Sequence, residues 1–528
     1  MNRFSGNSKI FNIVPPNERS AHLTHRLSII AIPLIVLYFS YYHGIYRHYL
    51  STPDADVLYA YEALLMNEAF RQDINVHTAY IYILFLALWV KIGGILGLIT
   101  ADTLSELPGP NAFEPMFAQI VFMGRWFSVF VAILFGWAFF KTIHVLTRNL
   151  ILAILVSCIF AASPALIIHT QLLRPEILAM FFIWIGFMCL HRAMNSIGWR
   201  SLMYLFLSAL FATLGIEAKV QVVPLAMAFP ALALVFKFSE RAEIRTHPVI
   251  QFSAAHWIFI LAATTVSIVA GVMMVGQIRA IGSPGYYQAG IVLFVATSIW
   301  VYGQKAGLSW RSPVLASMAV SSGVAMGQLM HVITNDPENT KAVVNFVEHM
   351  SRLAIVEVSK SPGGLGEIFK TLPRLIFDTF RTFVTFEGGI TIWTHNAIFW
   401  AALGGLVWNL HKGRKRKAAR IAILTTVGVG MEVFCRLRGG FSPLYIVFVD
   451  PWLLAAIAMA PCRQYINQAA TPSVVACGYN GVLVIVFIVG AFGSHHADLR
   501  TTQPIEKACD QARNYLKELP GYFNRYCN

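Results

Sequence analysis

Long apolar segments alternate with short polar ones along most of the chain. A membrane-spanning helix needs about 20 consecutive, mostly apolar residues. The predicted fold is therefore an all-α polytopic membrane protein. Its membrane domain covers residues 27–493, between a cytoplasmic leader at 1–26 and a short external tail at 494–528. The sequence predicts about thirteen spans, near residues 27–43, 119–140, 150–168, 174–191, 201–216, 219–236, 254–276, 286–303, 312–332, 394–410, 419–435, 443–460 and 474–492.

The apolar stretch 78–98 is the one segment whose assignment is open. Its hydropathy is high enough for a fourteenth span, but Lys91 and the pair Gly93-Gly94 interrupt it. Short cytoplasmic loops carry an excess of Lys and Arg. If 78–98 is peripheral, the basic loops, including HKGRKRKAAR at 411–420, share the side of the N-terminus, and nearly all acids lie on the other side. We therefore expect thirteen spans, a cytoplasmic N-terminus and an external C-terminus.

The composition agrees with a membrane protein and excludes an ordinary soluble one. Apolar residues make up 57% of the 528 residues and charged residues only 12%. The net charge of +14 would indicate nucleic-acid binding in a soluble chain. Here it is better explained by lysines and arginines on one membrane side, where the basic run 411–420 serves as a topology signal in contact with anionic lipid.

Two long outer segments are predicted, at 44–118 and 334–393. The first contains STPDADVLYAYEALLMNEAF at 51–70, in which apolar residues recur at helical spacing between four acids. This pattern predicts an amphipathic juxtamembrane helix on the membrane surface. The second contains LAIVEVSKSPGGLGEIFKTLPRLIFDTF, which predicts one or two surface-lying helices broken at Pro-Gly-Gly.

The acids of the first outer segment are candidates for acid–base chemistry. Asp54 and Asp56 precede the predicted helix, where a carboxylate can cap the helix or act as a general base. Glu62 and Glu68 lie within the helix and are better explained as part of a solvated face. We expect Asp54 and Asp56 to lie at the boundary between water and lipid.

Basic residues lie at the outer ends of several spans. They could hold a lipid phosphate, or they could form salt bridges with neighbours, such as Arg174 with Glu176 or Lys219 with Glu217. Arg125 lies inside a predicted span, and a charge at membrane depth is usually paired or functional. The candidate phosphate ligands are Lys219, Arg436, Arg438 and Arg174.

Candidate contacts to a substrate complete the set of site residues. His77 lies beside a tyrosine cluster at the start of the stretch 78–98 and could contact a sugar, although a lone histidine is more often structural. The candidate substrate contacts are His77, Tyr80, Glu176 and Tyr445. We also expect a disulfide between Cys509 and Cys527, which share the external tail.

Several motifs, in this order, resemble the GT-C membrane glycosyltransferases. The first outer segment has PDADVLYAYEALLMNEAF and then HTAYIYILFLALWVKIGG, and the next span opens with a buried arginine, GRWFSVFVAILFGWAFF. Later landmarks agree: SPALIIHTQLLRPEILAMFF, GIEAKVQVVPLAMAFP and FSPLYIVFVDPWLLAAIA. The chain is similar in style to the bacterial family that includes the lipid A aminoarabinose transferase, and to the protein O-mannosyltransferases. The likeness extends through most of the chain, but its motifs are short.

The resemblance implies particular roles for the site residues. Such enzymes take a sugar from a polyprenyl or dolichyl phosphate, with an Asp of the first outer loop as general base and basic residues on the phosphate. Asp56 is the best match to that Asp and Asp54 the second, while Lys219 matches a lysine that opens the sixth span. The chain departs from the pattern where Ala55 separates the two acids, and where His77 is not followed by a Pro-Pro turn.

We therefore expect an inverting glycosyltransferase of the bacterial inner membrane that acts on its periplasmic face. Its donor would be a sugar on a polyprenyl phosphate carrier, and its acceptor a lipid or glycan. No nucleic-acid partner is expected, and the sequence leaves the need for a divalent metal open. The alternatives are a transporter or flippase for a lipid-linked sugar, and a scaffold subunit without activity.

The loop charges make a topological prediction. A reporter fused after Gly413 should be cytoplasmic, because the surrounding loop is the most basic of the chain, and one fused after Thr501 should be external. Paired fusions to alkaline phosphatase and to a fluorescent protein measure the side at each site. The opposite result at either site would contradict the thirteen-span arrangement.

Overall fold

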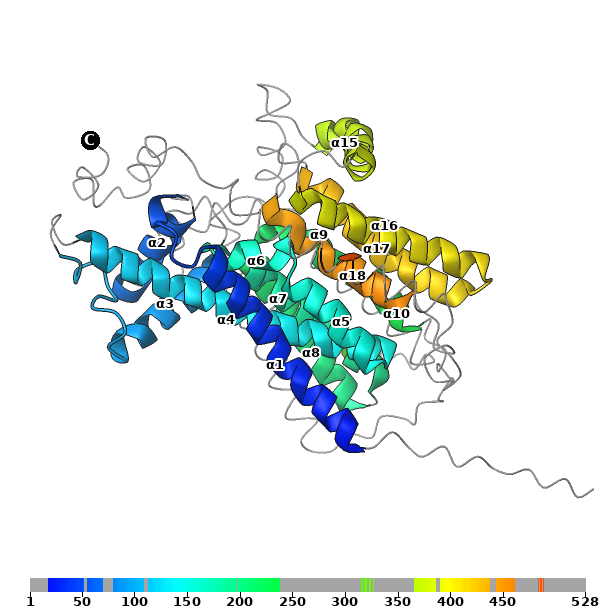
Figure 1. The fold of residues 1–528 in the computed structure, drawn as a ribbon, viewed down its shortest axis with the longest axis horizontal. Coiled ribbons are helices and arrows are strands. Elements are labelled where there is room, and N and C mark those ends of the chain that lie inside the picture. The colour runs from blue at the N-terminus through cyan, green and yellow to red at the C-terminus, as the bar shows by residue number, and fades with distance from the viewer. Residues whose placement is uncertain are drawn as a thin grey trace, which may run out of the picture.

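A computed structural model describes residues 18–51, 55–69, 79–108, 113–196, 198–237, 365–385, 390–436 and 443–460, with single positions within 315–326 and 483–488. Every regular element in these ranges is a helix (Figure 1). Four predicted spans, near 254–276, 286–303, 312–332 and 474–492, lie outside the described residues or are described only at single positions. The tail with Cys509 and Cys527 also lies outside them.

Four of the described helices are long and apolar enough to cross a membrane. They are α4 (Phe113–Thr147), α7 (Glu176–Asn195), α8 (Trp199–Ala218) and α17 (Lys415–Arg436). A fifth span is formed if α5 (Leu150–Ala161) and α6 (Pro164–Thr170), which meet at a bend of 49°, are counted together. These helices match predicted spans and give the chain the character of a helical membrane protein.

Two more predicted spans are helical but less clearly membrane-spanning. The helix α1 (Glu18–His43) covers the predicted span 27–43, and its apolar part is limited to Ile30–Tyr42. The helix α16 (Ile390–His411) covers the predicted span 394–410, and it is not among the four that are long and apolar enough.

The predictions of one continuous helix at 219–236 and at 443–460 are wrong. The first run divides into η2 (Val220–Val222), α9 (Val223–Met227) and α10 (Phe229–Lys237). The second is a 3₁₀ turn, η4 (Pro443–Phe448), followed by α18 (Asp450–Met459). Prolines explain the breaks, because each lacks the amide N–H that a continuous helix needs. They lie at Pro224, Pro230, Pro443 and Pro451.

The stretch 78–98 forms the helix α3 (Tyr80–Ile95), which is too short to count as a span. Its 16 residues extend about 24 Å, less than the roughly 30 Å of a bilayer core. Lys91 turns to the loop that follows, where its Nζ lies 2.7 Å from Asp102 Oδ1. The structure thus agrees with the peripheral assignment of this segment.

The helix of the first outer segment, α2 (Asp56–Ala69), lies where the sequence predicts it but is not a surface helix. All residues from Asp56 to Met66 are buried, so the predicted amphipathic exposure is wrong. Glu62, expected to be solvated, is only 1% exposed. Glu68 is exposed and accepts a hydrogen bond from Ser105 N at 3.0 Å. The helices α3 and α4 pack against α2, which helps to bury its mostly apolar side chains.

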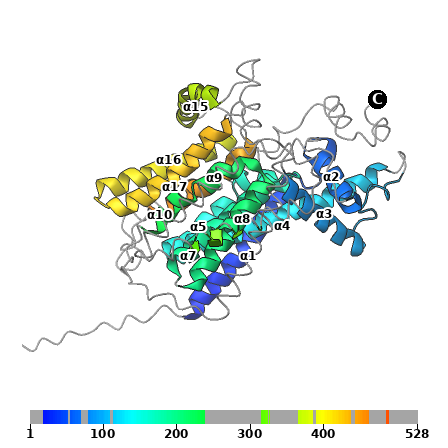
Figure 2. The same ribbon diagram turned by 180° about the vertical axis from the view of Figure 1, so that it is seen from behind.

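An aromatic layer joins the middle of the bundle. Phe135 and Phe139 of α4 pack against Phe160 of α5, with ring centroids 4.9 and 4.6 Å apart. Trp184 of α7 packs against Trp452 of α18 at 4.9 Å. All five side chains are buried. They hold α4, α5, α7 and α18 together as one core (Figures 1 and 2).

Hydrogen bonds define the directions of the helices. Ser128 donates to Leu172 O at 3.2 Å, and Trp184 Nε1 donates to Thr142 Oγ1 at 3.0 Å, so α4 and α7 run parallel. Farther along, α8 runs back beside α7, and α17 runs back beside α16 after a turn at 412–414. The segments that precede α7, follow α8 and precede α18 therefore meet at the same end of the bundle.

Candidate functional site

An ion pair buried inside the bundle connects Asp56 at the start of α2 with Arg125 of α4. Arg125 Nη2 lies 2.9 Å from Asp56 Oδ2, and its Nε lies 3.4 Å from Oδ1. The amide of Leu173 also donates to Asp56 Oδ1, at 3.0 Å. On its other side, Arg125 donates to the carbonyl of Ile45 at 2.9 Å and to that of Arg47. One guanidinium thus joins three separate parts of the chain.

This geometry changes the role expected for Asp56. Its side chain is 0% exposed, so the prediction that it lies at the water boundary is wrong. Both carboxylate oxygens accept hydrogen bonds from a cation, which leaves them poorly suited to take a proton from a hydroxyl in water. Breaking a buried ion pair is costly because the remaining charge has no counter-charge. Asp56 is therefore placed to hold α2 against α4 and the α6–α7 link.

A second buried cluster surrounds Glu176, the first residue of α7. Its Oε1 lies 3.3 Å from Arg174 Nη1 and 3.3 Å from Lys219 Nζ. The side chains of Glu176 and Lys219 are 0% and 3% exposed. The pairing of Arg174 with Glu176 was one of the salt bridges predicted from the sequence, and it is confirmed. A carboxylate at a helix N-terminus also interacts favourably with the helix dipole.

Several buried polar atoms in the two stretches that contain Glu176 and Lys219 have no hydrogen-bond partner within the described part of the chain. They come from two short stretches, 169–176 and 219–221, and are His169 Nδ1, Gln171 Nε2, Glu176 Oε2 and Gln221 Oε1. A buried polar group without a partner costs about 1–3 kcal/mol, and native proteins keep few of them. Their gathering beside two cations is the feature expected of a site that a polar ligand completes.

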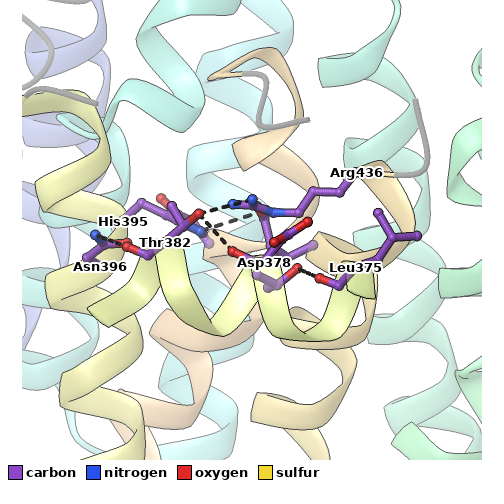
Figure 3. A network of polar contacts seen from close by, with 9 residues as sticks. Leu375, Asp378, Thr382, His395, Asn396 and Arg436 are labelled. Carbon is purple, nitrogen blue, oxygen red and sulfur yellow. Dashed lines mark hydrogen bonds and ion pairs between the residues drawn. The ribbon is translucent and has the colours of Figure 1, made fainter. Parts of the chain in front are cut away.

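A third cluster lies where α16, α17 and α18 meet (Figure 3). His395 Nδ1 lies 2.6 Å from Asp450 Oδ1, and its Nε2 lies 3.8 Å from Glu432 Oε2. Arg436 Nε donates to Glu432 Oε1 at 2.9 Å and Arg436 Nη1 donates to Thr382 Oγ1 at 3.1 Å. Arg436 was a candidate phosphate ligand, and it is instead held by Glu432 with only 6% exposure.

Sequence reasoning did not single out His395, Glu432 or Asp450 as functional. The signal was present, because each is an ionisable residue within an apolar segment, where charges are rare and usually paired or functional. Asp450 also stands in one of the motifs of the GT-C resemblance, VFVDPWLL. Which groups pair with which could not be read from the chain, since His395 and Asp450 are 55 residues apart.

Two side chains are each influenced by charges from more than one cluster. Tyr82 of α3 is within electrostatic range of Asp56, Glu176 and Arg174, which joins the first two clusters. Cys435 of α17 is within electrostatic range of both Glu176 and Glu432, which joins the second to the third. A small apolar cluster of Ala55, Ile168, Leu172 and Leu444 packs beside them.

The remaining predicted site residues have mixed outcomes. Tyr80 is 1% exposed, and burial, with the charge of Glu217 adding to it, raises the pKa of its hydroxyl. Tyr445 is buried in η4, beside Leu444, whose carbonyl accepts a hydrogen bond from His169 Nε2 at 3.0 Å. No group of three or more His, Cys, Asp or Glu side chains among the described residues could hold a metal ion. Three predicted residues lie outside the described part of the chain: Asp54, His77 and Arg438.

Comparisons with known proteins identify no relative. The chain matches no family model, no curated protein and no solved structure. Its function therefore has to be inferred from the residues and contacts of the site.

The ion pair generates a stability prediction. Arg125→Leu leaves the Asp56 carboxylate buried without its cation, and we expect a loss of about 3–5 kcal/mol in unfolding free energy. The double variant Asp56→Asn/Arg125→Leu should recover part of this loss, because no lone buried charge remains. Unfolding in detergent mixtures of increasing dodecyl sulfate content, followed by circular dichroism, measures both variants.

The matched control is Lys91→Leu, which breaks the Lys91–Asp102 ion pair of the outer loop, where the lysine side chain is 44% exposed. This variant should unfold close to the wild-type midpoint, because an exposed ion pair contributes little. A structural role of the buried pair would be contradicted if Arg125→Leu unfolded at the wild-type midpoint, or if Arg125→Leu and Lys91→Leu shifted the midpoint equally.

Proposed function

We propose that the protein transfers a sugar from a polyprenyl-phosphate carrier to a lipid or glycan acceptor, as the GT-C membrane glycosyltransferases do. The observation that carries this proposal is the Glu176 cluster. Two cations, Arg174 and Lys219, share one buried carboxylate oxygen, and polar atoms without partners surround them. The cluster lies among apolar helices, where a lipid-borne phosphate can arrive from the membrane.

The two cations suit the chemistry of a phosphate leaving group. Phosphate oxygens form strong charge-assisted hydrogen bonds with Arg and Lys. Glu176 holds both side chains in place, so that little rearrangement is needed when a phosphate binds. Cations aimed at the oxygen where negative charge develops lower the barrier of transfer more than they strengthen binding of the donor.

Glu176 is also the carboxylate best placed to contact the substrate. One of its oxygens, Oε1, forms ion pairs with Arg174 and Lys219. The other, Oε2, has no hydrogen-bond partner among the described residues. We propose that Oε2 accepts a hydrogen bond from a hydroxyl of the sugar or of the acceptor. Asp56, whose oxygens accept hydrogen bonds from Arg125 and from the amide of Leu173, then serves to position α2 beside this site. Attack from the side opposite the phosphate would invert the anomeric centre.

The distribution of basic residues supports an external location for the site. Arg148, Arg200 and the basic residues from Lys412 to Lys417 lie at or beside the helix ends opposite the α6–α7 link and the α8–η2 junction. Basic loops face the cytoplasm. In the proposed arrangement the protein lies in the bacterial inner membrane with thirteen spans, and its site faces the periplasm.

One observation favours the second candidate function, a transporter or flippase for the same lipid-linked sugar. The run from Val220 to Lys237 is broken into η2, α9 and α10 beside Lys219. Transporters often build their substrate sites from discontinuous helices of this kind. Such a protein would bind the carrier phosphate with the same cations but would not cleave the bond to the sugar.

Lys219→Ala tests the phosphate site. Loss of one charge-assisted contact should cost roughly 1.5–3 kcal/mol, or about ten- to hundred-fold in affinity for a polyprenyl phosphate. Titration of the carrier into purified protein in detergent measures the affinity. Lys91→Ala removes a lysine from the outer loop and serves as the control with unchanged affinity. Equal affinity in wild type and Lys219→Ala would remove Lys219 from the site.

Glu176→Gln separates binding from transfer. It keeps the size of the side chain but removes the charge that holds both cations, so we expect a loss in turnover larger than the change in carrier affinity. Release of polyprenyl phosphate from a panel of carrier-linked sugars measures turnover. If wild-type protein releases none but moves the labelled carrier across a vesicle membrane, the transporter is the correct function.

A further inference from the structure

The helix α15 (Leu365–Thr385) lies across the end of the α16–α17 hairpin. Figures 1 and 2 both show α15 nearly end-on, whereas α16 and α17 extend across the view. It packs against the N-terminal half of α16, at Asn396 and Trp400, and against the last turn of α17, at Arg436. Its axis is therefore steeply inclined to the helices that could cross a membrane, as expected of a helix in the plane of the bilayer.

One face of α15 is firmly attached to the hairpin. Trp400 Nε1 donates to Phe383 O at 2.8 Å, and Asn396 Nδ2 donates to Thr382 O at 3.1 Å. The Phe383 ring stacks on Phe399, with centroids 4.0 Å apart and an interplanar angle of 11°. Figure 3 shows Thr382 facing this attachment, where its hydroxyl also accepts the hydrogen bond from Arg436.

The next face of α15 is apolar, and its side chains are exposed in the part of the chain that the structure describes. Phe377 is 67% exposed and Val384 is 61% exposed, and Ile376 and Phe380 on the same side are 40% and 47% exposed. Spacings of three and four residues place these side chains in one stripe. Beyond the stripe lies a polar edge with Arg374, Asp378 and Arg381, of which Arg374 is 81% exposed. The helix thus has an attached, an apolar and a polar face.

The apolar stripe continues a similar one on α16. There Trp393, Trp400 and Val407 are 49%, 41% and 57% exposed, at intervals of seven residues. Tryptophan is enriched where a membrane meets water. Trp400 is hydrogen-bonded to the backbone of α15, so the two stripes are adjacent. Together they form one apolar band that runs along α16 and continues onto α15.

We infer that α15 is an interfacial helix that binds the surface of an anionic lipid bilayer. Its apolar stripe lies at the boundary of the acyl chains, and its polar edge lies among the headgroups. The charges fit this occupant, because α15 carries three basic and two acidic residues, and both of its arginines, Arg374 and Arg381, lie on the polar edge beside the stripe. Through Thr382, the same helix connects the lipid surface with the buried cluster of Arg436, Glu432 and His395.

Site-directed spin labelling of the full chain in lipid vesicles tests this inference. On a background without the native cysteines, labels are placed at Phe377→Cys and Phe380→Cys, and Asp378→Cys is the matched control on the polar edge. Vesicles are made of phosphatidylcholine with and without added phosphatidylglycerol. Collision with oxygen, which concentrates in the bilayer, is compared with collision with a water-soluble nickel complex.

We expect the labels at 377 and 380 to collide mainly with oxygen and the label at 378 mainly with nickel, more so with phosphatidylglycerol present. Equal nickel access at all three positions would place the stripe in water and overturn the inference. Low access of 377 and 380 to both reagents would also overturn it, because the stripe would then be covered by protein. Circular dichroism of each variant in the same vesicles confirms that the labelled chain has kept its helices.

Discussion

The ion pair between Asp56 and Arg125 is the constraint on which the end of the bundle with α2 and the α6–α7 link depends. Arg125 is a cation inside an apolar helix, and such a charge must be neutralised where it lies. Its hydrogen bonds reach the start of α2, the segment after α1 and, through Asp56, the amide of Leu173 before α7. The position of the Glu176 cluster follows from this, because Leu173 and Arg174 belong to the same short link.

Local patterns in the sequence predicted much of the helical fold. The spans at 119–140, 174–191, 201–216 and 419–435 appear as single helices, because a long apolar run can satisfy its backbone only by becoming helical. Arg174 and Glu176 were a predictable pair, since they are two residues apart. The breaks near Pro224 and Pro451 were also predictable, but hydropathy outweighed the prolines in the interpretation of those runs.

Contacts between distant parts of the chain could not be predicted in this way. Asp56 and Arg125 are 69 residues apart, and nothing in the sequence of either segment indicates that the two form a pair. Glu62 and Glu68 were therefore interpreted as part of a solvated face, although Asp56 to Met66 of α2, Glu62 included, are buried. The network of His395, Glu432 and Asp450 could not be predicted for the same reason, because its members come from three different helices. Charge patterns indicate that such residues need partners, but only the packing determines which.

The separation between Lys219 and Glu176 depends on a residue that carries no charge. Gly215 of α8 lies so close to α7 that a Cβ there would be 3.0 Å from the carbonyl oxygen of Ala179. Lys219 follows one turn later, directly after the end of α8, and Glu176 lies just under one turn earlier on α7. The missing side chain thus sets the distance between two helix ends, and with it the reach of a lysine to its carboxylate. A side chain at position 215 would push the two helices apart, so the contact between Lys219 and Glu176 depends on the close approach that this glycine permits.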